Sequence, residues 1–443
     1  MKRTVAFLLA VLLLLPFAVR AEEYAALPAF FQVKYQVKEQ TINNGRSFVS
    51  KDVITTALPQ VDHEINGLVD RYDQQLSGQM KGYKNPKRNS RLDIHVVHTV
   101  SGESCVSFLV LAREVYSRKQ QQSPFTTRVY DMADGRLVTL QDLFADGSPA
   151  WDTLASAVRE QLSAYFPNEK ADENTLDQLC QREALRTAPF LLGPVCLTLH
   201  YEAKTLYPKH PSLMKVRIPY ANLRQDMTDY GKRQTDNSRY KMAALTFDDG
   251  PAYENSAKII NYLRQHGAQG TFFVVGERIK EYLDIVMREN DEQHSVQSHH
   301  YKHTNSEKST VGRTQKYTQD FYKALTGAIG TAPLMLRPPY GKYEMFIKAK
   351  VDLPLILWDV DTKDWAGRSA SRVLSVVREE TKPGSIILLH DIKDKTPESA
   401  RVVMDWLKEN NYLCVTVEDL FQHFGQPMTP NRVYNSVKPA SRN

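Results

Sequence analysis

The sequence predicts a two-part α/β protein, in which an α+β domain precedes a domain related to the (β/α) barrel. Strand and helix patterns are mixed before residue 225, whereas short apolar strands alternate with helical segments after residue 240. The length agrees with this division, because 443 residues correspond to two or three domains at about 100–200 residues each. With 42% apolar and 24% charged residues, the composition is that of a globular protein and not of a disordered or fibrous one.

The first 21 residues predict a secretory signal peptide. The basic start Met1-Lys2-Arg3 precedes an apolar run from Val5 to Val19. The segment Val19-Arg20-Ala21 has the small residues of a cleavage site. We expect cleavage after Ala21. An uncleaved anchor is the alternative, although the apolar run is shorter than the ~20 residues that span a bilayer. We expect no integral membrane segment in the mature chain, which would be secreted or associated with the cell envelope.

The net charge argues against one class of partner, and the cysteine content limits the possible disulfides. The 57 basic and 51 acidic residues leave a net charge of +6, too small an excess to predict nucleic-acid binding. Four cysteines are too few for a disulfide scaffold, and whether Cys180 and Cys196 form a bridge is left open. Cys105 and Cys414 lie in apolar, strand-like runs, where a thiol acts as a small hydrophobic group.

Residues 22–225 are predicted to form the α+β domain. The first strand begins at Phe31, where apolar and polar residues alternate, and ends at the turn Asn43–Gly45. Further strands are predicted over 92–100, 105–113, 126–132 and 137–140. Apolar residues at three- and four-residue intervals predict helices over 53–76 and 151–165, and the domain is expected to close near residues 216–220.

A polar segment at 226–240 predicts a linker to the second domain, residues 241–424. Seven strand candidates with helical segments between them predict a parallel sheet in a barrel, with function at the carboxyl ends of the strands. The seven are 243–247, 270–275, 295–298, 334–336, 355–360, 385–389 and 412–417. The tail at 425–443 is rich in Pro, Asn, Ser and Arg, so we expect it to be disordered.

Polar residues follow five of these strands directly. Because the carboxyl ends of parallel strands meet at one edge, the five loops are expected to face one mouth. A single Asp pair or histidine is usually a surface or core residue, so the prediction of an active site depends on the coincidence at the strand ends. The loops are Thr246–Pro251, His299–His303, Arg337–Gly341, Asp361–Trp365 and Leu389–Asp391.

Asp249, His299 and His303 are the predicted metal ligands. Two imidazoles four residues apart lie on one side of a helical turn, and a carboxylate from another strand completes a three-ligand site whose fourth position is open to water or substrate. The expected ion is Zn²⁺, with Co²⁺ or Mn²⁺ as alternatives. The competing interpretation is a surface run of histidines, since His294 and His300 lie in the same tract.

The neighbouring residues supply a predicted acid and base. Asp248 is free to act as the base because two adjacent carboxylates cannot both face the ion, and Arg337 is expected to keep it ionised and oriented. If the substrate is an amide, an acid must protonate the nitrogen as it leaves as an amine. His390 is the expected acid, with Asp364 as the partner that keeps it protonated.

Three residues are predicted to contact the substrate. The double proline before Tyr340 stiffens its loop, so the backbone N–H of Tyr340 is expected to donate to a developing oxyanion. Trp365 and Leu388 are predicted apolar walls for a small acyl group, although both are also consistent with ordinary core residues.

Five segments resemble, in order and spacing, the motifs of the polysaccharide deacetylases, also called the NodB-homology domain or carbohydrate esterase family 4. These are Thr246–Gly250, His299–His303, Arg337–Gly341, Asp361–Trp365 and Leu389–His390. The resemblance covers about residues 240–425 and implies a metal-dependent N-deacetylase on a distorted (β/α) barrel. The family's base, metal ligands, base-orienting arginine, acid and acid-tuning aspartate match the residues assigned above.

Two departures from the family pattern are present. His300 stands where the family usually has Ser or Thr, and Ser295–Gln297 replaces a common Glu-Ile-Gly. Both are expected to affect the fine adjustment of the metal's properties, and neither changes the expected ligands.

The first domain resembles, more weakly, the extracytoplasmic domains of multidomain peptidoglycan N-acetylmuramic acid deacetylases of Bacillus. The segments Tyr130–Phe144 and Val216–Tyr220 carry this resemblance, which implies a cell-wall context and a wall-binding or sensing role. The expected function is removal of N-acetyl groups from amino sugars of peptidoglycan, with release of acetate. The alternatives are a chitooligosaccharide deacetylase and an inactive wall-binding or sensing protein.

Overall fold

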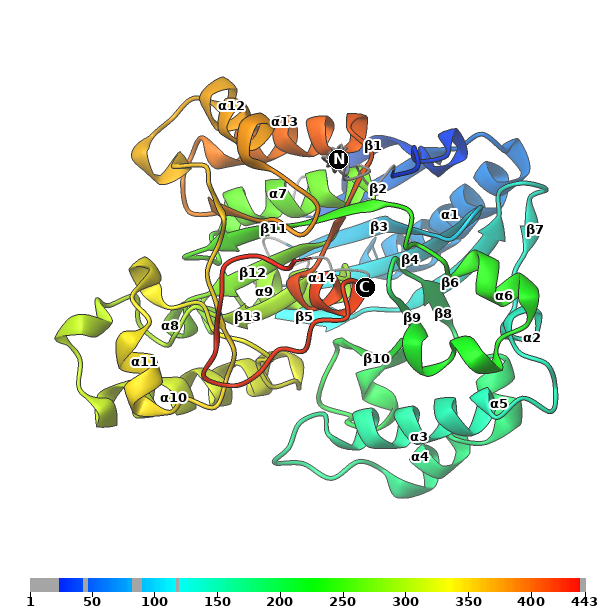
Figure 1. Ribbon diagram of the computed structural model, residues 1–443. Helices are drawn as coiled ribbons and strands as arrows, with labels where there is room; N and C mark the ends of the chain where they lie inside the picture. The colour runs from blue at the N-terminus through cyan, green and yellow to red at the C-terminus, as the bar shows by residue number, and fades with distance from the viewer. Residues whose placement is uncertain (1–23, 43–46, 82–89, 117–118, 439–443) are drawn as a thin grey trace, which may run out of the picture.

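The computed structural model describes residues 24–42, 47–81, 90–116 and 119–438. The predicted signal peptide and the predicted turn at Asn43–Gly45 lie outside these ranges. The chain forms an α+β region followed by a barrel-like α/β domain, and the two pack directly against each other (Figure 1). The predicted fold class is confirmed.

The first region is built on a seven-stranded sheet of order β1-β2-β3-β4-β6-β7, with β5 paired to β4. Only β2 and β3 are parallel within it. Its elements are β1 Lys34–Ile42, β2 Ser47–Thr55, α1 Pro59–Lys81, β3 Ser90–Ser101, β4 Cys105–Tyr116, β5 Lys119–Gln122, β6 Phe125–Asp131 and β7 Arg136–Leu137. The predicted helix over 53–76 starts later than expected, because residues 53–55 extend β2 and pair with β1.

A three-stranded sheet, β10-β9-β8, and a group of helices complete the first region. Their bounds are α2 Leu140–Leu143, α3 Ala150–Ser163, α4 Glu173–Leu179, α5 Arg182–Arg186, β8 Phe190–Leu192, β9 Cys196–Glu202 and β10 Leu213–Pro219. The strand predicted over 137–140 stops at Leu137, because Asp142 accepts from the backbone N–H and hydroxyl of Thr139 and so starts α2. All four cysteines are free thiols.

The segment 226–240, which we predicted to be a polar linker between the two domains, packs against the first region. It contains α6 Asp229–Gln234, and its polar groups bond to the turn between β3 and β4. Asn237 Oδ1 accepts from the Gly102 N–H at 2.9 Å, and the Tyr240 hydroxyl donates to the Gly102 carbonyl at 2.9 Å. The buried side chains of Gln234 and Asn237 therefore satisfy a buried turn, whereas Asp229, Arg233, Ser238 and Arg239 are exposed.

The second domain holds a curled parallel sheet of order β13-β12-β11-β16-β15, with β17 also paired to β11. Bridges from Ser298 to Leu336 and from Leu336 to Leu355 continue the curl to β14. The strands are β11 Lys241–Asp248, β12 Gly270–Val274, β13 Ser295–Ser298, β14 Leu355–Ile356, β15 Val360–Asp361, β16 Ile386–His390, β17 Tyr412–Val415 and β18 Val433–Tyr434. The single strand predicted over 355–360 is thus divided in two.

Helices cover the outside of this sheet, as alternation of strands and helices requires. They are α7 Tyr253–His266, α8 Gly276–Ile279, α9 Leu283–Asp291, α10 Val311–Ile329, α11 Glu344–Ala349, α12 Ala370–Glu380, α13 Thr396–Glu409 and α14 Val417–His423. In Figure 1, α7, α12 and α13 lie along one side and α10 and α11 form a separate lobe.

The expected disorder of the tail is wrong for residues 425–438. β18 pairs with β14, and Tyr434 and Val437 are buried at 5% and 1% exposure. The Val437 N–H donates to the Gly384 carbonyl at 2.9 Å. The prediction from composition missed this packing because Tyr434 and Val437 are isolated apolar residues among polar neighbours. Residues 439–443 lie outside the described ranges.

A buried ionic network joins the two regions. Arg264 of α7 contacts Asp52 of β2 at 2.9 Å and Glu292, after α9, at 3.0 Å. Glu292 also contacts Arg288 at 2.6 Å and His95 of β3 at 2.7 Å. These side chains are at most 3% exposed, so each charge depends on its partners for solvation.

Arg264→Met should lower the free energy of unfolding by about 3–5 kcal/mol, because it leaves the buried carboxylates of Asp52 and Glu292 without their shared cation. Urea denaturation followed by circular dichroism measures the change. The control is Lys316→Met, which removes an exposed pair with Asp320 and should leave the midpoint unchanged. Equal midpoints for the two variants would contradict a structural role for the network.

Candidate metal centre and active site

The carboxyl edge of the curled sheet brings the predicted residues together. Asp248 ends β11 and Asp249 follows it, while His390 ends β16 in direct register with Asp248. His299 follows β13, which pairs with β12 on the other side of β11. The expectation that these loops face one mouth therefore agrees with the strand order.

Asp249, His299 and His303 offer ligand atoms that lie within 4.8 Å of one another. The Nε2 atoms of His299 and His303 are 3.3 Å and 3.1 Å from Asp249 Oδ1. The His299 Nδ1–H donates to the Arg337 carbonyl at 2.8 Å, which leaves the Nε2 lone pair for an ion. Asp249 Oδ1 is buried with no hydrogen-bond partner among the described residues. These features fit a divalent cation with one coordination position left open.

The loop that carries the two histidines is not the helical turn that their spacing predicted. His300 has a φ of 67°, in the left-handed region, and this reversal returns the chain so that His303 faces His299. His300 itself is buried and its Nε2 lies 3.3 Å from the Thr314 carbonyl, outside the ligand cluster. His294 lies at the start of β13, at the other end of the strand.

The charge states of the cluster suit metal binding. Burial, together with the neighbouring His299, lowers the pKa of His303, so the neutral imidazole is favoured. Burial raises the pKa of Asp249, but its contacts with the imidazoles of His299 and His303 outweigh burial and hold that pKa below its usual range. A neutral imidazole and an ionised carboxylate are the forms that coordinate a cation.

Asp248 is held by a fully buried arginine. Arg337 Nη1 donates to Asp248 Oδ1 and to Thr246 Oγ1, each at 2.7 Å. Its Nε and Nη2 donate to the carbonyls of Ile356 and Leu357 at 3.1 Å and 2.8 Å. The second carboxylate oxygen, Oδ2, lies 3.9 Å from His299 Nε2. Asp248 is therefore fixed with one oxygen on the arginine and the other beside the metal ligands.

His390 and Asp364 form a second charged pair. His390 Nδ1 lies 2.8 Å from Asp364 Oδ1, and Asp364 Oδ2 accepts from the His390 N–H at 2.8 Å and from Thr396 Oγ1 at 2.6 Å. Burial lowers the pKa of His390, but the hydrogen bond to Asp364 and the charges of Asp248 and Asp364 raise it by more, so the net shift is upward. The protonated imidazole is thus favoured, with Nδ1–H on Asp364 and Nε2–H available for transfer.

The three predicted substrate contacts differ in exposure. Tyr340 has a φ of 60° and is 61% exposed, and its ring centroid lies 4.5 Å from that of His303. Trp365 is 52% exposed. Leu388 is 2% exposed and lies on the same face of β16 as His390, two residues away. Tyr340 and Trp365 are therefore accessible, whereas Leu388 is part of the barrel interior.

The structure adds Asp391, which the sequence argument did not assign. Its carboxyl group is fully buried and hydrogen-bonded to Ser256 Oγ, and burial, with the charges of Asp249 and Asp248, raises its pKa to about 7. A Cβ on Gly250 would lie 2.2 Å from Asp391 Oδ2, so Asp391 packs directly against the loop that carries Asp249. The sequence feature that could have identified Asp391 is its position directly after His390.

The curled parallel barrel carries an Asp-His-His cluster with an Asp/Arg pair and a His/Asp pair beside it, an arrangement suited to a hydrolase. The family model for polysaccharide deacetylase matches residues 235–352. The chain is 32% identical over 186 residues to a peptidoglycan-N-acetylglucosamine deacetylase of Bacillus cereus, which covers 40% of this chain and 68% of that protein. The chain belongs to the polysaccharide deacetylase family.

Two further similarities were found. The peptidoglycan-N-acetylglucosamine deacetylase PgdA of Listeria monocytogenes is 28% identical over 303 residues, which are 66% of this chain and 64% of that protein. The chain thus spans less than two thirds of the length of PgdA. The solved structure of the peptidoglycan deacetylase PdaC from Bacillus subtilis has 29% identity and a TM-score of 0.41, with 42% of this chain and 93% of that chain covered.

Within the described residues, no helix combines the length and the apolar character that a membrane crossing requires.

His303→Ala should reduce bound zinc from about one equivalent to near zero, because it removes one of three protein ligands. Mass spectrometry of the purified, dialysed protein measures the metal content. His390→Ala is the matched control, since it removes a nearby imidazole that is not in the ligand cluster and should retain the metal. Full metal content in His303→Ala would remove His303 from the ligand set.

Proposed function

We propose that the protein hydrolyses the N-acetyl groups of amino sugars in peptidoglycan, releasing acetate and leaving a free amine. The observation that carries this proposal is the presence of a fixed carboxylate, Asp248, and a raised-pKa imidazole, His390, beside one metal-ligand cluster. Amide hydrolysis needs both, because water must lose a proton as it attacks and the amine must gain one as it leaves.

A divalent cation held by Asp249, His299 and His303 would supply a Lewis acid for the acetamide carbonyl and lower the pKa of water. The Asp-His-His donor set favours Zn²⁺, with Co²⁺ or Mn²⁺ as possible replacements.

The chain's own residues perform the proton transfers. Asp248, oriented by its hydrogen bond from Arg337, takes a proton from the water that attacks the acetamide carbon. The backbone N–H of Tyr340 donates to the oxygen on which negative charge develops. His390 then gives its Nε2 proton to the sugar nitrogen as the C–N bond breaks, and Asp364 stabilises the imidazolium beforehand. The products are acetate and the amino sugar.

Two observations support peptidoglycan as the substrate. Relatives such as PgdA and the Bacillus cereus enzyme are named as peptidoglycan deacetylases, and the similarity to PgdA covers more of the chain than residues 241–443 make up. The predicted signal peptide would deliver the chain to the cell envelope. Residues 22–225, joined to the barrel by the buried network, are proposed to be a wall-binding or sensing domain.

Incubation of residues 22–443 with muropeptides and with N-acetylglucosamine oligomers, followed by mass spectrometry, tests the proposal. We expect acetyl loss from muropeptides with metal-loaded protein and none after chelation. Acetyl loss from the free oligomers alone would assign a chitooligosaccharide deacetylase instead.

Asp248→Asn should lower the rate of acetate release by at least about 10²-fold, because the amide cannot take the proton from water. Metal content should stay at the wild-type level, since Asp248 is not in the ligand cluster. Acetate release and metal content are measured on the same sample. A fully active Asp248→Asn protein would rule out Asp248 as the base.

Asp364→Asn should move the alkaline limb of the pH–rate profile to lower pH. As the acid, His390 acts when protonated, so the rate falls as pH rises through its raised pKa, and loss of Asp364 removes the largest contribution to that increase. The control is Asp361→Asn, whose carboxylate contacts the Lys363 N–H and Trp365 and not His390. An unchanged alkaline limb in Asp364→Asn would contradict the assignment of His390.

A further inference from the structure

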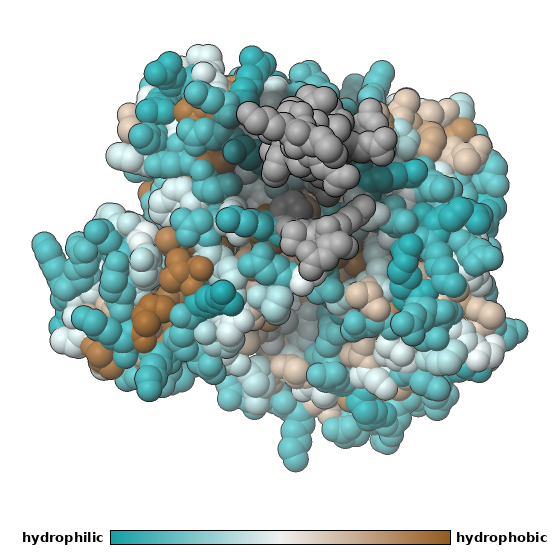
Figure 2. Space-filling model, in the orientation of Figure 1, coloured by the Kyte–Doolittle hydropathy of each residue, from teal (hydrophilic) through white to brown (hydrophobic). Residues whose placement is uncertain are grey.

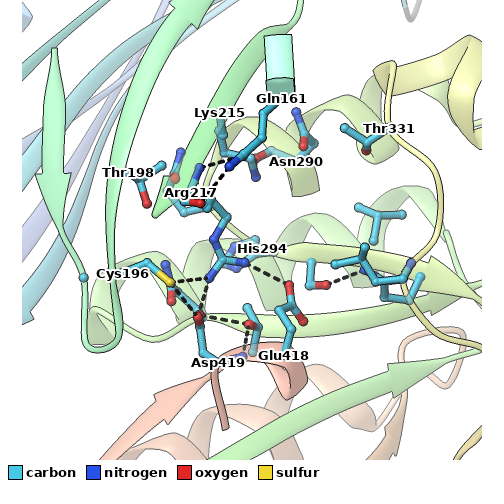
Figure 3. Close-up of a pocket in the computed structure, with 18 of the residues that line it drawn as sticks. Gln161, Cys196, Thr198, Lys215, Arg217, Asn290, His294, Thr331, Glu418 and Asp419 are labelled. Carbon is cyan, nitrogen blue, oxygen red and sulfur yellow. Dashed lines mark hydrogen bonds and ion pairs between the residues drawn. The ribbon is translucent and has the colours of Figure 1, made fainter. Parts of the chain in front are cut away.

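A cavity of about 530 Å³ lies between the first region and the barrel. Its walls come from α3, β9 and β10 on one side and from α10, α14 and the segment before β13 on the other (Figure 3). Gln269 precedes β12 and Ser295 begins β13, so the cavity meets the amino ends of these strands, whereas the metal-ligand cluster follows their carboxyl ends. This volume falls within the ~300–1,000 Å³ typical of small-molecule sites.

The cavity opens to solvent between two lobes. In Figure 1 the lobe of α10 and α11 and the lobe of α3 and α4 lie apart from each other below the barrel, and Figure 2 shows that the face of the molecule seen in this orientation is mostly hydrophilic. Tyr322 and Leu334 line the cavity and are 43% and 53% exposed, so they form its rim. A small molecule can therefore enter without separation of the two regions.

Buried polar groups in the cavity wall lack partners. His294 is 3% exposed, and its Nδ1 accepts from the Gly270 N–H at 3.3 Å, which places the proton on Nε2. Burial lowers the pKa of His294 to about 3, so the ring is neutral. Among the described residues, no hydrogen bond reaches His294 Nε2, Gln269 Oε1 or Glu418 Oε2. Because buried polar atoms are normally paired, one donor and two acceptors remain for a ligand.

The charges that line the cavity compensate one another. Arg217 of β10 contacts Glu418 at 3.1 Å and is hydrogen-bonded to Asp419, both of α14 (Figure 3). The Lys215 ammonium donates to the Asn290 carbonyl at 2.8 Å. Two cations and two carboxylates leave no net charge, so a charged ligand would have no counterpart. The wall also carries apolar groups, including Val195 and Val296.

We propose that this cavity binds a neutral saccharide of one or two rings, at a site separate from the metal-ligand cluster. A sugar hydroxyl both donates and accepts, so neighbouring hydroxyls can pair with His294 Nε2–H and with Gln269 Oε1. The C–H face of the ring packs on the apolar wall. A free peptide fits less well, because its charged ends would be buried without partners.

The site spans both regions of the chain. Lys215 and Arg217 belong to the first region, whereas His294, Gln269 and Glu418 belong to the barrel domain. A bound saccharide would therefore contact the two regions at once. The site does not depend on the proposed deacetylation.

Titration calorimetry of the full metal-loaded chain with cellobiose tests the proposal, because cellobiose is a neutral disaccharide without an acetamide and cannot be a substrate of the proposed reaction. We expect saturable binding with one site per chain. A free dipeptide with charged ends, titrated in parallel, should give no saturable heat. N,N′-diacetylchitobiose is titrated into His303→Ala, which lacks a metal ligand, and binding there should persist.

Three variants locate the binding. Gln269→Ala removes an unpartnered acceptor and should weaken the affinity by about fivefold or more. Gln319→Ala, on the exposed face of α10 and outside the cavity, is the matched control and should bind as the wild type does. Ala332→Trp, which places a large ring in the cavity, should abolish binding.

The proposal is overturned if neither disaccharide binds, if the free dipeptide alone binds, or if Gln269→Ala and Ala332→Trp both bind like the wild type. Acetate release is measured separately on each variant. Loss of acetate release in His303→Ala with retained saccharide binding would separate this site from the proposed active site.

Discussion

The hydrogen bonds of Arg337 are the constraint on which the site depends. Its side chain joins Asp248 of β11 to the carbonyls of Ile356 and Leu357, and its own carbonyl accepts from the metal-ligand candidate His299. One residue thus sets the position of the proposed base, one proposed ligand and the curl of the sheet. A guanidinium suits this position because it offers several donors in a rigid plane and remains charged when buried.

The two regions of the chain are held together by buried polar contacts as well as by apolar packing. Glu292 contacts Arg264, Arg288 and His95. Arg217 of the first region contacts Glu418 and Asp419 of the barrel domain, at the same junction between the two regions. Such pairs contribute directional restraints, since a shift of either region leaves a buried charge without a partner. Arg217, Glu418 and Asp419 also line the cavity between the two regions, which is why its wall is partly polar.

The sequence predicted most of the barrel strands and the meeting of the candidate site residues at one edge of the sheet, because polar groups placed directly after apolar strands lie at the carboxyl edge of a parallel sheet. The roles of these residues stay predictions. It did not predict the left-handed turn at His300, which forms within the tertiary structure. Asp391 and Asn237 were missed for a related reason, since each is fixed by a partner far away in the chain. Composition also misassigned the tail, where isolated apolar residues such as Tyr434 complete a buried seam.

That seam has a consequence for the order in which the protein can assemble. The Leu357 N–H donates to the Tyr434 carbonyl at 2.7 Å, and the Leu357 carbonyl in turn accepts from Arg337. The support of the proposed base therefore extends to β18, which follows all the other barrel strands in the chain. During synthesis those strands emerge before β18, so the anchor behind Arg337 is complete only after β18 has emerged, and the site matures later than the sheet that carries it.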